Sequence, residues 1–220
     1  LRDGRTREIT VIRDTIQVPT IETNFDRASG VYTIALYEFT ATSVAHFNAA
    51  LADFRASGSR KLVVDLRGNP GGYLDAAVRI SSFFLPRNEV VVTEDYKGKD
   101  KNMVHRSSGA GGVPAGTQVV VLIDKGSASA SEIVAGALKD HGVATLIGTP
   151  SFGKGSVQEL IPVVNAALKV TVARWLTPSG KSISDGGLTP DIEVERTPED
   201  RAAGNDPQME RALRFLNTGD

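Results

Sequence analysis

The 220-residue chain contains no cysteine, and this absence excludes several kinds of chemistry. A chain without cysteine can form no disulfide bond, no thiolate nucleophile and no cysteine-ligated metal site. Histidine is scarce as well, because only His46, His105 and His141 are present and their spacing matches no metal-binding motif. We therefore expect neither a metal ion nor another cofactor. A Ser-His-Asp triad stays open, since its members come together in space rather than along the chain.

Long hydrophobic runs and a net charge of one sign are also missing. The longest apolar runs, such as residues 117–123, are far shorter than the ~20 residues that cross a bilayer. No signal-peptide pattern is present, but the chain begins with Leu1, so we expect a piece of a longer protein, and any targeting segment would lie in the missing part. The 25 lysines and arginines balance 26 aspartates and glutamates, so charge gives no attraction to a nucleic-acid partner.

Apolar residues recur at two spacings that alternate along the middle of the chain. Continuous runs of Val, Leu and Ile predict buried strands, whereas apolar residues three or four positions apart predict helices. Because alternating strands and helices usually build a sheet of mainly parallel strands, the sequence predicts an α/β domain. Strands are predicted at residues 31–39, 61–67, 89–96, 117–124 and 143–149, and helices at residues 40–58, 73–85 and 129–142.

Other segments depart from this alternation. Residues 97–116 contain five glycines and no apolar period, so we expect a mobile loop there. Residues 167–177 alternate as an edge or hairpin strand would, and residues 206–219 predict an amphipathic helix. We divide the chain into a linker strand or the end of a preceding domain at residues 1–18, a main domain at 19–198, and a tail with a helix at 199–220.

Residues 148–156, "GTPSFGKGS", nearly match a phosphate-binding loop. Gly153 and Lys154 fit, but a nucleotide-binding loop needs Ser or Thr next, and Gly155 stands there instead. The following residues, with Pro162 among them, also disfavour the long helix whose N-terminus would bind phosphate. A nucleotide binder is therefore the least favoured function, and the lysine needs another explanation.

The segment "SASAS" marks a junction between a buried strand and a helix. Ser129, followed by Glu132, fits the capping-box pattern that satisfies the first N–H groups of a helix. A serine at this position can also be a nucleophile, because the free N–H groups and the positive end of the helix dipole stabilise an oxyanion. Its hydroxyl then needs a base, and Lys154 is the candidate if its amine is uncharged. An ordinary helix cap and an ordinary exposed lysine are the alternatives.

Taken together, these motifs resemble the C-terminal processing peptidases, also called tail-specific proteases. The resemblance runs from about residue 28 to residue 194 and implies a fold of the ClpP and crotonase type, with flanking β segments at both ends. The segments that carry it are residues 62–72 ("LVVDLRGNPGG"), 126–138 ("GSASASEIVAGAL"), 148–158 ("GTPSFGKGSVQ") and 173–194 ("ARWLTPSGKSI" to "GGLTPDIEV").

The resemblance also implies roles for individual residues. Ser129 would be the nucleophile, Lys154 the general base, and Gln158 the residue that orients the lysine. The backbone N–H groups of Ala130 and Gly71 would form the oxyanion hole. An enzyme of this kind would cleave protein or peptide substrates at or near exposed C-terminal tails through an acyl-enzyme, without a cofactor.

The family setting carries further expectations. Members usually have a PDZ domain before this core, so residues 1–18 would be its end or a linker. The setting implies a bacterial periplasm or cell envelope and allows a homo-oligomer. For the second oxyanion donor, Gly72 is the next choice after Gly71. A binding module that has lost catalysis on the same scaffold stays an alternative, although the presence of Ser129, Lys154 and Gln158 together favours the enzyme.

Overall fold

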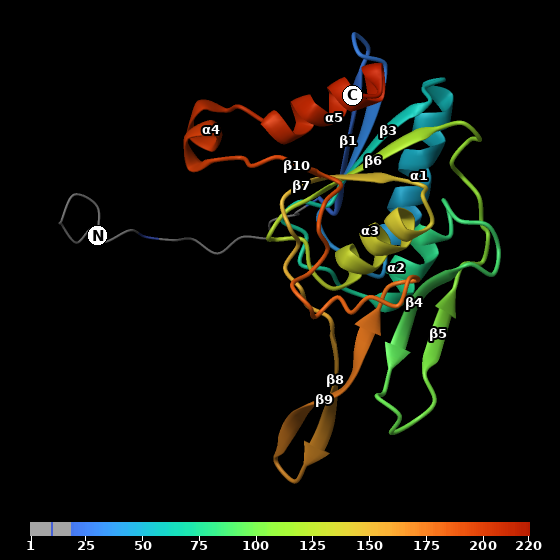
Figure 1. Ribbon diagram of the computed structural model, residues 1–220, viewed down its shortest axis with the longest axis vertical. Helices are drawn as coiled ribbons and strands as arrows, with labels where there is room; N and C mark the ends of the chain where they lie inside the picture. The colour runs from blue at the N-terminus through green and yellow to red at the C-terminus, as the bar shows by residue number, and fades with distance from the viewer. Residues whose placement is uncertain (1–9, 11–18) are drawn as a thin grey trace.

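The computed structural model of this chain describes residue 10 and residues 19–220, which form two β-sheets with helices packed against them (Figure 1). Except for Thr10, the segment predicted as a linker or the end of a preceding domain lies outside these described residues. The division of the chain at residues 18 and 198 stays a prediction.

The larger sheet contains, in spatial order, β1 (Ile21–Asp26), β2 (Val31–Leu36), β3 (Lys61–Asp65), β6 (Gln118–Ile123), β7 (Thr145–Gly148) and β10 (Ile192–Glu193). Within this sheet, β2, β3, β6, β7 and β10 run parallel to one another, and β1 pairs antiparallel with β2 at the edge. The predicted sheet of mainly parallel strands is thus confirmed.

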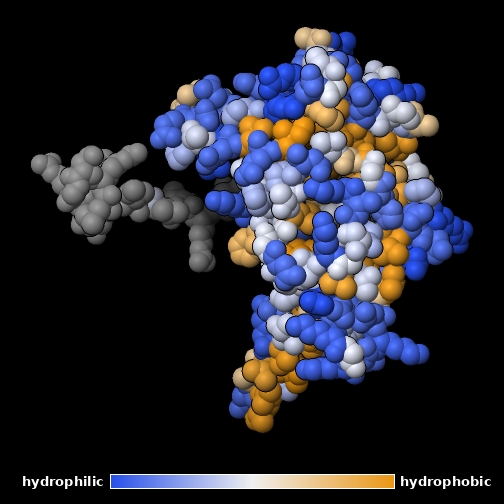
Figure 2. Space-filling view, viewed as in Figure 1, coloured by the Kyte–Doolittle hydropathy of each residue, from blue (hydrophilic) through white to orange (hydrophobic). Residues whose placement is uncertain are grey.

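The smaller sheet contains, in spatial order, β5 (Met103–Arg106), β4 (Val90–Asp95), β9 (Ala166–Leu176) and β8 (Ser156–Val163), all antiparallel. Strands β8 and β9 form a hairpin that projects from the rest of the molecule (Figure 1). Every residue from 158 to 169 is exposed, and the tip is strongly apolar (Figure 2). The hairpin expected from the alternating pattern is therefore present, without a covering element among the described residues.

The loop predicted at residues 97–116 is wrong at β5. This strand is only 4 residues long and mostly exposed, so it lacks the buried apolar run on which strand prediction depends. Its structure comes instead from backbone pairing with β4. The preceding and following parts of the segment are turns and irregular chain.

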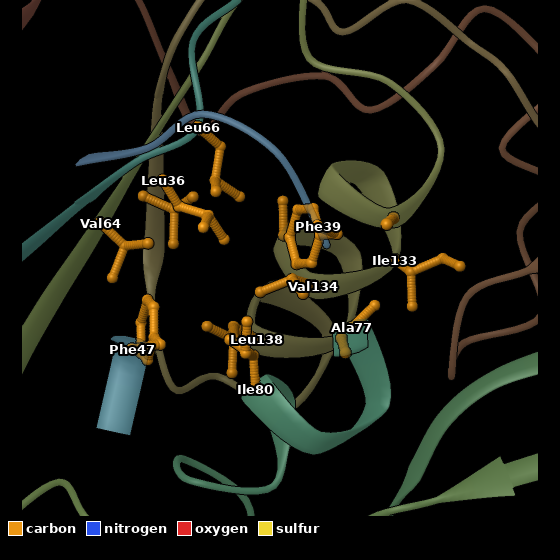
Figure 3. Packing of buried hydrophobic residues seen from close by; sticks show 14 of the residues in the cluster. Leu36, Phe39, Phe47, Val64, Leu66, Ala77, Ile80, Ile133, Val134 and Leu138 are labelled. Carbon is orange, nitrogen blue, oxygen red and sulfur yellow. The ribbon is translucent and has the colours of Figure 1, made fainter. Parts of the chain in front are cut away.

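Both faces of the larger sheet are buried. Successive residues of a strand point to opposite faces, so one strand contributes side chains to both. On β3, Leu62 belongs to one hydrophobic cluster and Val63 to another. Phe47, Ile80 and Val134 belong to the first cluster, which lies against three helices (Figure 3). Burial of each such large side chain contributes about 1.5–3 kcal/mol. These helices are α1 (Ser43–Ala56), α2 (Leu74–Ser81) and α3 (Ala130–Asp140).

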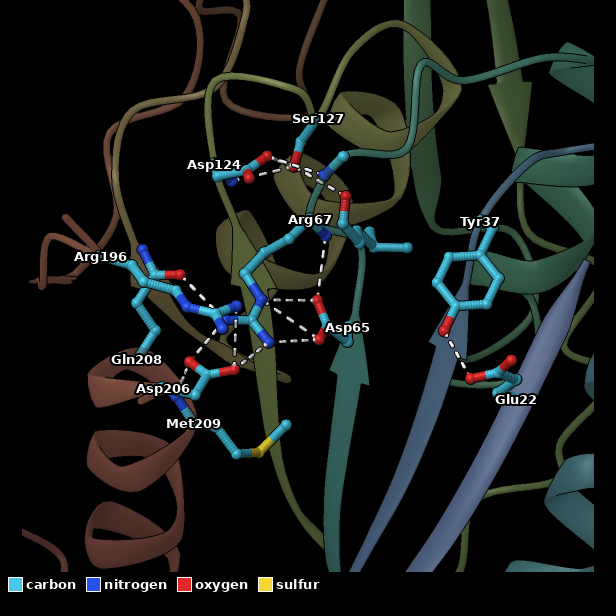
Figure 4. A network of polar contacts seen from close by, with 12 residues as sticks. Glu22, Tyr37, Asp65, Arg67, Asp124, Ser127, Arg196, Asp206, Gln208 and Met209 are labelled. Atoms are coloured by element: carbon cyan, nitrogen blue, oxygen red, sulfur yellow. Dashed lines mark hydrogen bonds and ion pairs between the residues drawn. The ribbon is translucent and has the colours of Figure 1, made fainter. Parts of the chain in front are cut away.

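The opposite face of the sheet is covered by the last helix, α5 (Pro207–Thr218), which follows the short α4 (Pro198–Ala203). Ala212 and Leu216 of α5 are buried in the second cluster, among residues of β3, β6 and β7. Asp206, the N-cap of α5, accepts hydrogen bonds from Arg67 at 2.7 and 2.9 Å (Figure 4). The predicted amphipathic helix is therefore an integral part of the core.

Three segments that carry the predicted site follow strands of the parallel sheet. Residues 66–72 follow β3, residues 124–129 follow β6, and residues 149–155 follow β7. Since parallel neighbours end at the same edge of a sheet, the three segments meet at the carboxyl edge, where α/β proteins commonly bind ligands.

Candidate active site

Ser129 lies in a strained turn between β6 and α3. Its backbone has φ of 55° and ψ of −114°, a conformation that residues other than glycine rarely adopt. Such a conformation costs on the order of 1–3 kcal/mol and is maintained only where the surroundings fix it. Ser129 itself is partly exposed, whereas Ala128 and Ala130 on either side are buried.

The turn is fixed by hydrogen bonds to the segment that follows β3. The N–H of Ala128 and the hydroxyl of Ser131 both donate to the carbonyl of Asn69, each at 3.0 Å. The hydroxyl of Ser127 donates to the carbonyl of Leu66 at 2.8 Å. The nucleophile turn, residues 127–131, is therefore attached to Asn69 of the glycine turn, residues 68–72, and to Leu66 just before it.

Gly71 lies directly against the candidate nucleophile. A Cβ atom on Gly71 would come within 2.8 Å of Ser129 Cβ and 2.9 Å of the Ala130 nitrogen, so only glycine fits. The Gly71 N–H, however, already donates to Asn69 Oδ1 at 2.9 Å and would have to leave that bond to reach an oxyanion. The N–H groups of Ala130 and Gly72 have no hydrogen-bond partner among the described residues. The oxyanion roles stay predictions.

Lys154 lies close to Ser129 through its backbone. Its N–H donates to Glu132 Oε2 at 3.0 Å, and the Ser129 N–H donates to the same oxygen at 2.8 Å. The two backbone nitrogens can therefore be no farther apart than the sum of these distances. The Lys154 residue is exposed, and its amine has no hydrogen bond or ion pair with the described residues. The structure thus brings the two residues together without joining their side chains.

Gln158 lies on β8, four positions after Lys154, opposite Thr171 of β9. A register irregularity separates Val157 from Gln158, and Gln158 is exposed. Its side chain makes no hydrogen bond to the described residues, so its role in orienting the lysine stays a prediction.

Glu132 is the residue whose importance sequence reasoning underestimated. The capping-box pattern identified its bond to the Ser129 N–H, and that bond is present. The pattern gave no sign that the carboxylate also binds the N–H groups of Gly153 and Lys154, at 2.6 and 3.0 Å. No local spacing rule links positions this far apart in the sequence, so only the folded chain reveals the contact.

The three histidines are occupied away from Ser129. His46 bonds Thr20 Oγ1 at 3.0 Å, His105 bonds Glu94 at 2.7 Å, and His141 bonds the carbonyl of Val90 at 2.8 Å. A Ser-His-Asp triad at Ser129 is therefore not assembled. Within the described ranges, no group of three or more His, Asp or Glu residues could hold a metal ion. Nor does any described helix have the length and apolarity needed to cross a bilayer.

The nucleotide alternative also fails on geometry. A phosphate-binding loop leads into a helix whose N-terminus receives the phosphate. The residues after Lys154 instead form β8, a strand. The lysine between two glycines is therefore not part of such a loop.

Comparison with known proteins identifies related proteases. Residues 30–194 match peptidase family S41. A carboxy-terminal-processing protease of Bartonella bacilliformis is 43% identical over 205 residues, covering 90% of this chain and 46% of that protein. The structure of the photosystem II D1 C-terminal processing protease is 27% identical with a TM-score of 0.75, covering 94% of this chain and 54% of that one. The tricorn protease shares the fold, with a TM-score of 0.59 at 19% identity, over 88% of this chain and 18% of that one.

These similarities confirm the expected fold of the ClpP and crotonase type and the resemblance to C-terminal processing proteases. The chain spans less than half of the length of the curated relative from Bartonella. The family match includes the glycine turn, the nucleophile turn and the loop with Lys154. This chain belongs to peptidase family S41, a family of serine peptidases.

Proposed function

We propose that this chain is the catalytic core of a serine endopeptidase that cleaves proteins at or near exposed C-terminal tails, with Ser129 as nucleophile and Lys154 as general base. One observation carries the residue assignment: a single carboxylate oxygen of Glu132 binds the backbone N–H groups of both residues. Membership of family S41 supports the hydrolase chemistry. The name of the Bartonella relative supports the preference for C-terminal tails.

The reaction would proceed through an acyl-enzyme. Ser129 Oγ attacks the scissile carbonyl carbon while the uncharged amine of Lys154 takes the hydroxyl proton. The resulting oxyanion accepts hydrogen bonds from the Ala130 N–H and from the glycine turn, each worth roughly 3 kcal/mol of barrier height. The C–N bond then breaks, and the proton passes from Lys154 to the leaving amine. Water, activated by the same lysine, hydrolyses the ester and frees the serine.

Lys154 must lose its proton before it can act as a base. The exposed amine has no carboxylate partner among the described side chains. A substrate chain that lies over the amine would remove water from it, and desolvation favours the uncharged form. We therefore place the activation of Lys154 in the substrate complex, with Gln158 orienting the amine.

The test is cleavage of a denatured protein that ends in an apolar tail, followed by mass spectrometry of the fragments. The wild-type chain should cleave it, whereas Ser129→Ala and Lys154→Ala should each abolish cleavage without changing the melting temperature appreciably. Lys99→Ala, at an exposed loop position, is the matched control and should keep full activity. Undiminished turnover in Lys154→Ala would show that another group is the base.

A second candidate is a binding module that holds protein tails without cutting them. The exposed Lys154 and Gln158, neither of which contacts Ser129 by a hydrogen bond, are the observation that favours it. Tail binding without any fragment, equal in the wild type and in Ser129→Ala, would support this function and exclude the peptidase. In either case we propose a location in a bacterial cell envelope, which fractionation of the source cells would test.

A further inference from the structure

Glu132, in the first turn of α3, is completely buried, with an exposed fraction of 0%. Its carboxylate accepts four hydrogen bonds, two on each oxygen. Oε2 receives the N–H groups of Ser129 at 2.8 Å and Lys154 at 3.0 Å, and Oε1 receives the N–H of Gly153 and the hydroxyl of Ser151, both at 2.6 Å.

All four partners donate to Glu132. The Ser151 hydroxyl accepts a hydrogen bond from the Leu188 N–H at 2.7 Å and donates to Glu132 Oε1 at 2.6 Å. A carboxylate has room for two donors on each oxygen, so these four bonds match its hydrogen-bonding capacity. No Lys, Arg or His of the described chain forms an ion pair with Glu132.

Burial of an unpaired carboxylate is expensive, typically several kcal/mol before hydrogen bonds compensate it. A helix cap needs only the bond to the Ser129 N–H, which a partly exposed glutamate could also make. The other three bonds serve the loop of residues 151–154, which carries Lys154. Capping alone does not account for a fully buried carboxyl group whose hydrogen bonds are shared between the two segments.

We propose that Glu132 is a positioning residue that holds the nucleophile turn and the Lys154 loop in one register. This proposal rests on the proposed function, because it concerns how the two halves of that site are kept together. Ser129 and Lys154 lie on separate segments that follow different strands, so nothing local in the sequence fixes their distance. The shared Oε2 atom connects the backbones of the two residues directly and limits the distance between them.

The same carboxylate extends the connection to a third segment. Ser151 donates to Oε1, and Ser151 and Leu188 exchange two further bonds, since the Ser151 N–H donates to the Leu188 carbonyl at 3.1 Å. The loop with Lys154 is therefore held between Glu132 on one side and Leu188 on the other. Loss of the carboxylate leaves the bonds to Leu188 and the bond from the Phe152 N–H to the Ser127 carbonyl at 3.0 Å, and removes every other hydrogen bond between the loop and the nucleophile turn.

The decisive variant is Glu132→Gln, which keeps the length of the side chain but places an NH2 group against N–H donors. We expect kcat to fall about 100-fold with KM little changed, because misplacement of a catalytic group by about 1 Å costs on this order. Ser151→Ala, which removes one bond and leaves Oε2 intact, should lower kcat by a smaller factor. Glu195→Gln, at an exposed position, is the control and should match the wild type.

A fluorophosphonate that labels the nucleophilic serine separates positioning from simple loss of structure. In the positioning role, Glu132→Gln is labelled on the same fraction of molecules as the wild type, but each labelled site turns over slowly. Equal turnover per site, with only the labelled fraction reduced, would overturn the proposal, as would an unchanged kcat. If Glu132→Gln does not fold, Ser151→Ala decides by the same criterion.

Failure of the positioning role of Glu132 is distinguishable from failure of the proposed peptidase function. If the wild-type chain cleaves and Ser129→Ala does not, the peptidase stands whatever Glu132→Gln does. If Ser129→Ala cleaves as well as the wild type, the peptidase assignment fails first, and the role of Glu132 in positioning fails with it.

Discussion

At the scale of single residues, the candidate site residues differ in how much of their geometry can be predicted from the sequence. The serine and the lysine are identified by motifs whose residues are close together in the chain. The Gly71 N–H is different, because its bond to Asn69 Oδ1 depends on where a buried side chain points. A motif specifies that a glycine is needed there, but the direction of its N–H follows from the folded turn.

Gly71→Ala should disable the site. The new Cβ would lie 2.6 Å from the Ala128 carbonyl oxygen and 2.8 Å from Ser129 Cβ, so the nucleophile turn would have to move. We expect kcat/KM for the tailed substrate to fall on the order of 100-fold. Steady-state cleavage assays of the folded variant measure this loss.

Gly68→Ala is the control from the same turn. Gly68 also has a positive φ, of 68°, but a Cβ there meets nothing within 4 Å. Both alanines have a positive φ, of 68° at Gly68 and 99° at Gly71, and the left-handed conformation costs an alanine about 1–2 kcal/mol, which denaturant unfolding reports. Only Gly71→Ala adds the clash with the nucleophile turn. Equal losses of activity in the two variants would show that strain, rather than contact with Ser129, is responsible.

At the scale of elements, the strands and helices with strong apolar periods are the ones that the sequence predicts well. The central strands β3 and β6 and the helix α3 are present where continuous or periodic apolar residues predicted them. The strand β5 was missed because it is short and exposed. The turn of the β8–β9 hairpin was also beyond prediction, since it has no glycine to mark its type.

A substitution in this turn should stabilise the hairpin. Val163 pairs with Ala166, so Val164 and Asn165 form a two-residue turn, and Val164 alone of the two has a positive φ, of 42°. This is the position where type II′ turns favour glycine. Because a β-branched residue is strained there, we expect Val164→Gly to stabilise the hairpin by about 1 kcal/mol.

Hydrogen exchange of residues 158–169 is the suitable measurement, since this part of the hairpin is exposed on both faces and global unfolding would report it poorly. Exchange should slow in Val164→Gly. The neighbouring Val163→Gly, at a position without positive φ, should make it faster. Faster exchange in both variants would contradict the strain at Val164.

At the scale of the whole molecule, the sequence predicted the C-terminal helix but not its place. Its amphipathic pattern indicates that one face is buried, and it does not say against what. In the structure α5 closes the second face of the parallel sheet, which otherwise would leave Val63, Val120 and Ile147 uncovered. The site lies at the carboxyl edge of this same sheet, so the helix supports it from a distance.

Leu216→Ala should therefore destabilise the entire domain. The side chain is 2% exposed and packs in the cluster between α5 and the sheet. Truncation of a buried leucine costs about 2–5 kcal/mol, which urea unfolding would detect as a lower midpoint. Arg214→Ala, at an exposed position of the same helix, should change stability by less than about 0.5 kcal/mol. A midpoint unchanged in Leu216→Ala would mean that α5 is not a structural part of the domain.

The attachment of α5 also predicts how the domain responds to acid. Burial raises the pKa of Asp206, but the hydrogen bonds and charge of Arg67, with the Met209 N–H and Arg196, outweigh it and hold the pKa below its usual value. A carboxyl whose pKa is lowered by folding stabilises the protein above its unfolded pKa of about 3.9. That stabilisation disappears as the pH falls through the lower folded pKa. Asp206 therefore protects the domain at neutral pH and ceases to do so in acid.

Asp206→Asn isolates this charge, because asparagine is an equally good N-cap and leaves the start of α5 intact. The variant should be less stable than the wild type at pH 6, where Arg67 loses one of its two carboxylate partners. The difference should shrink steadily below about pH 4, as the wild-type carboxyl takes up its proton. Urea unfolding at several pH values measures both curves. If they run parallel down to acid pH, Asp206 contributes through its shape as a cap rather than through its charge on Arg67.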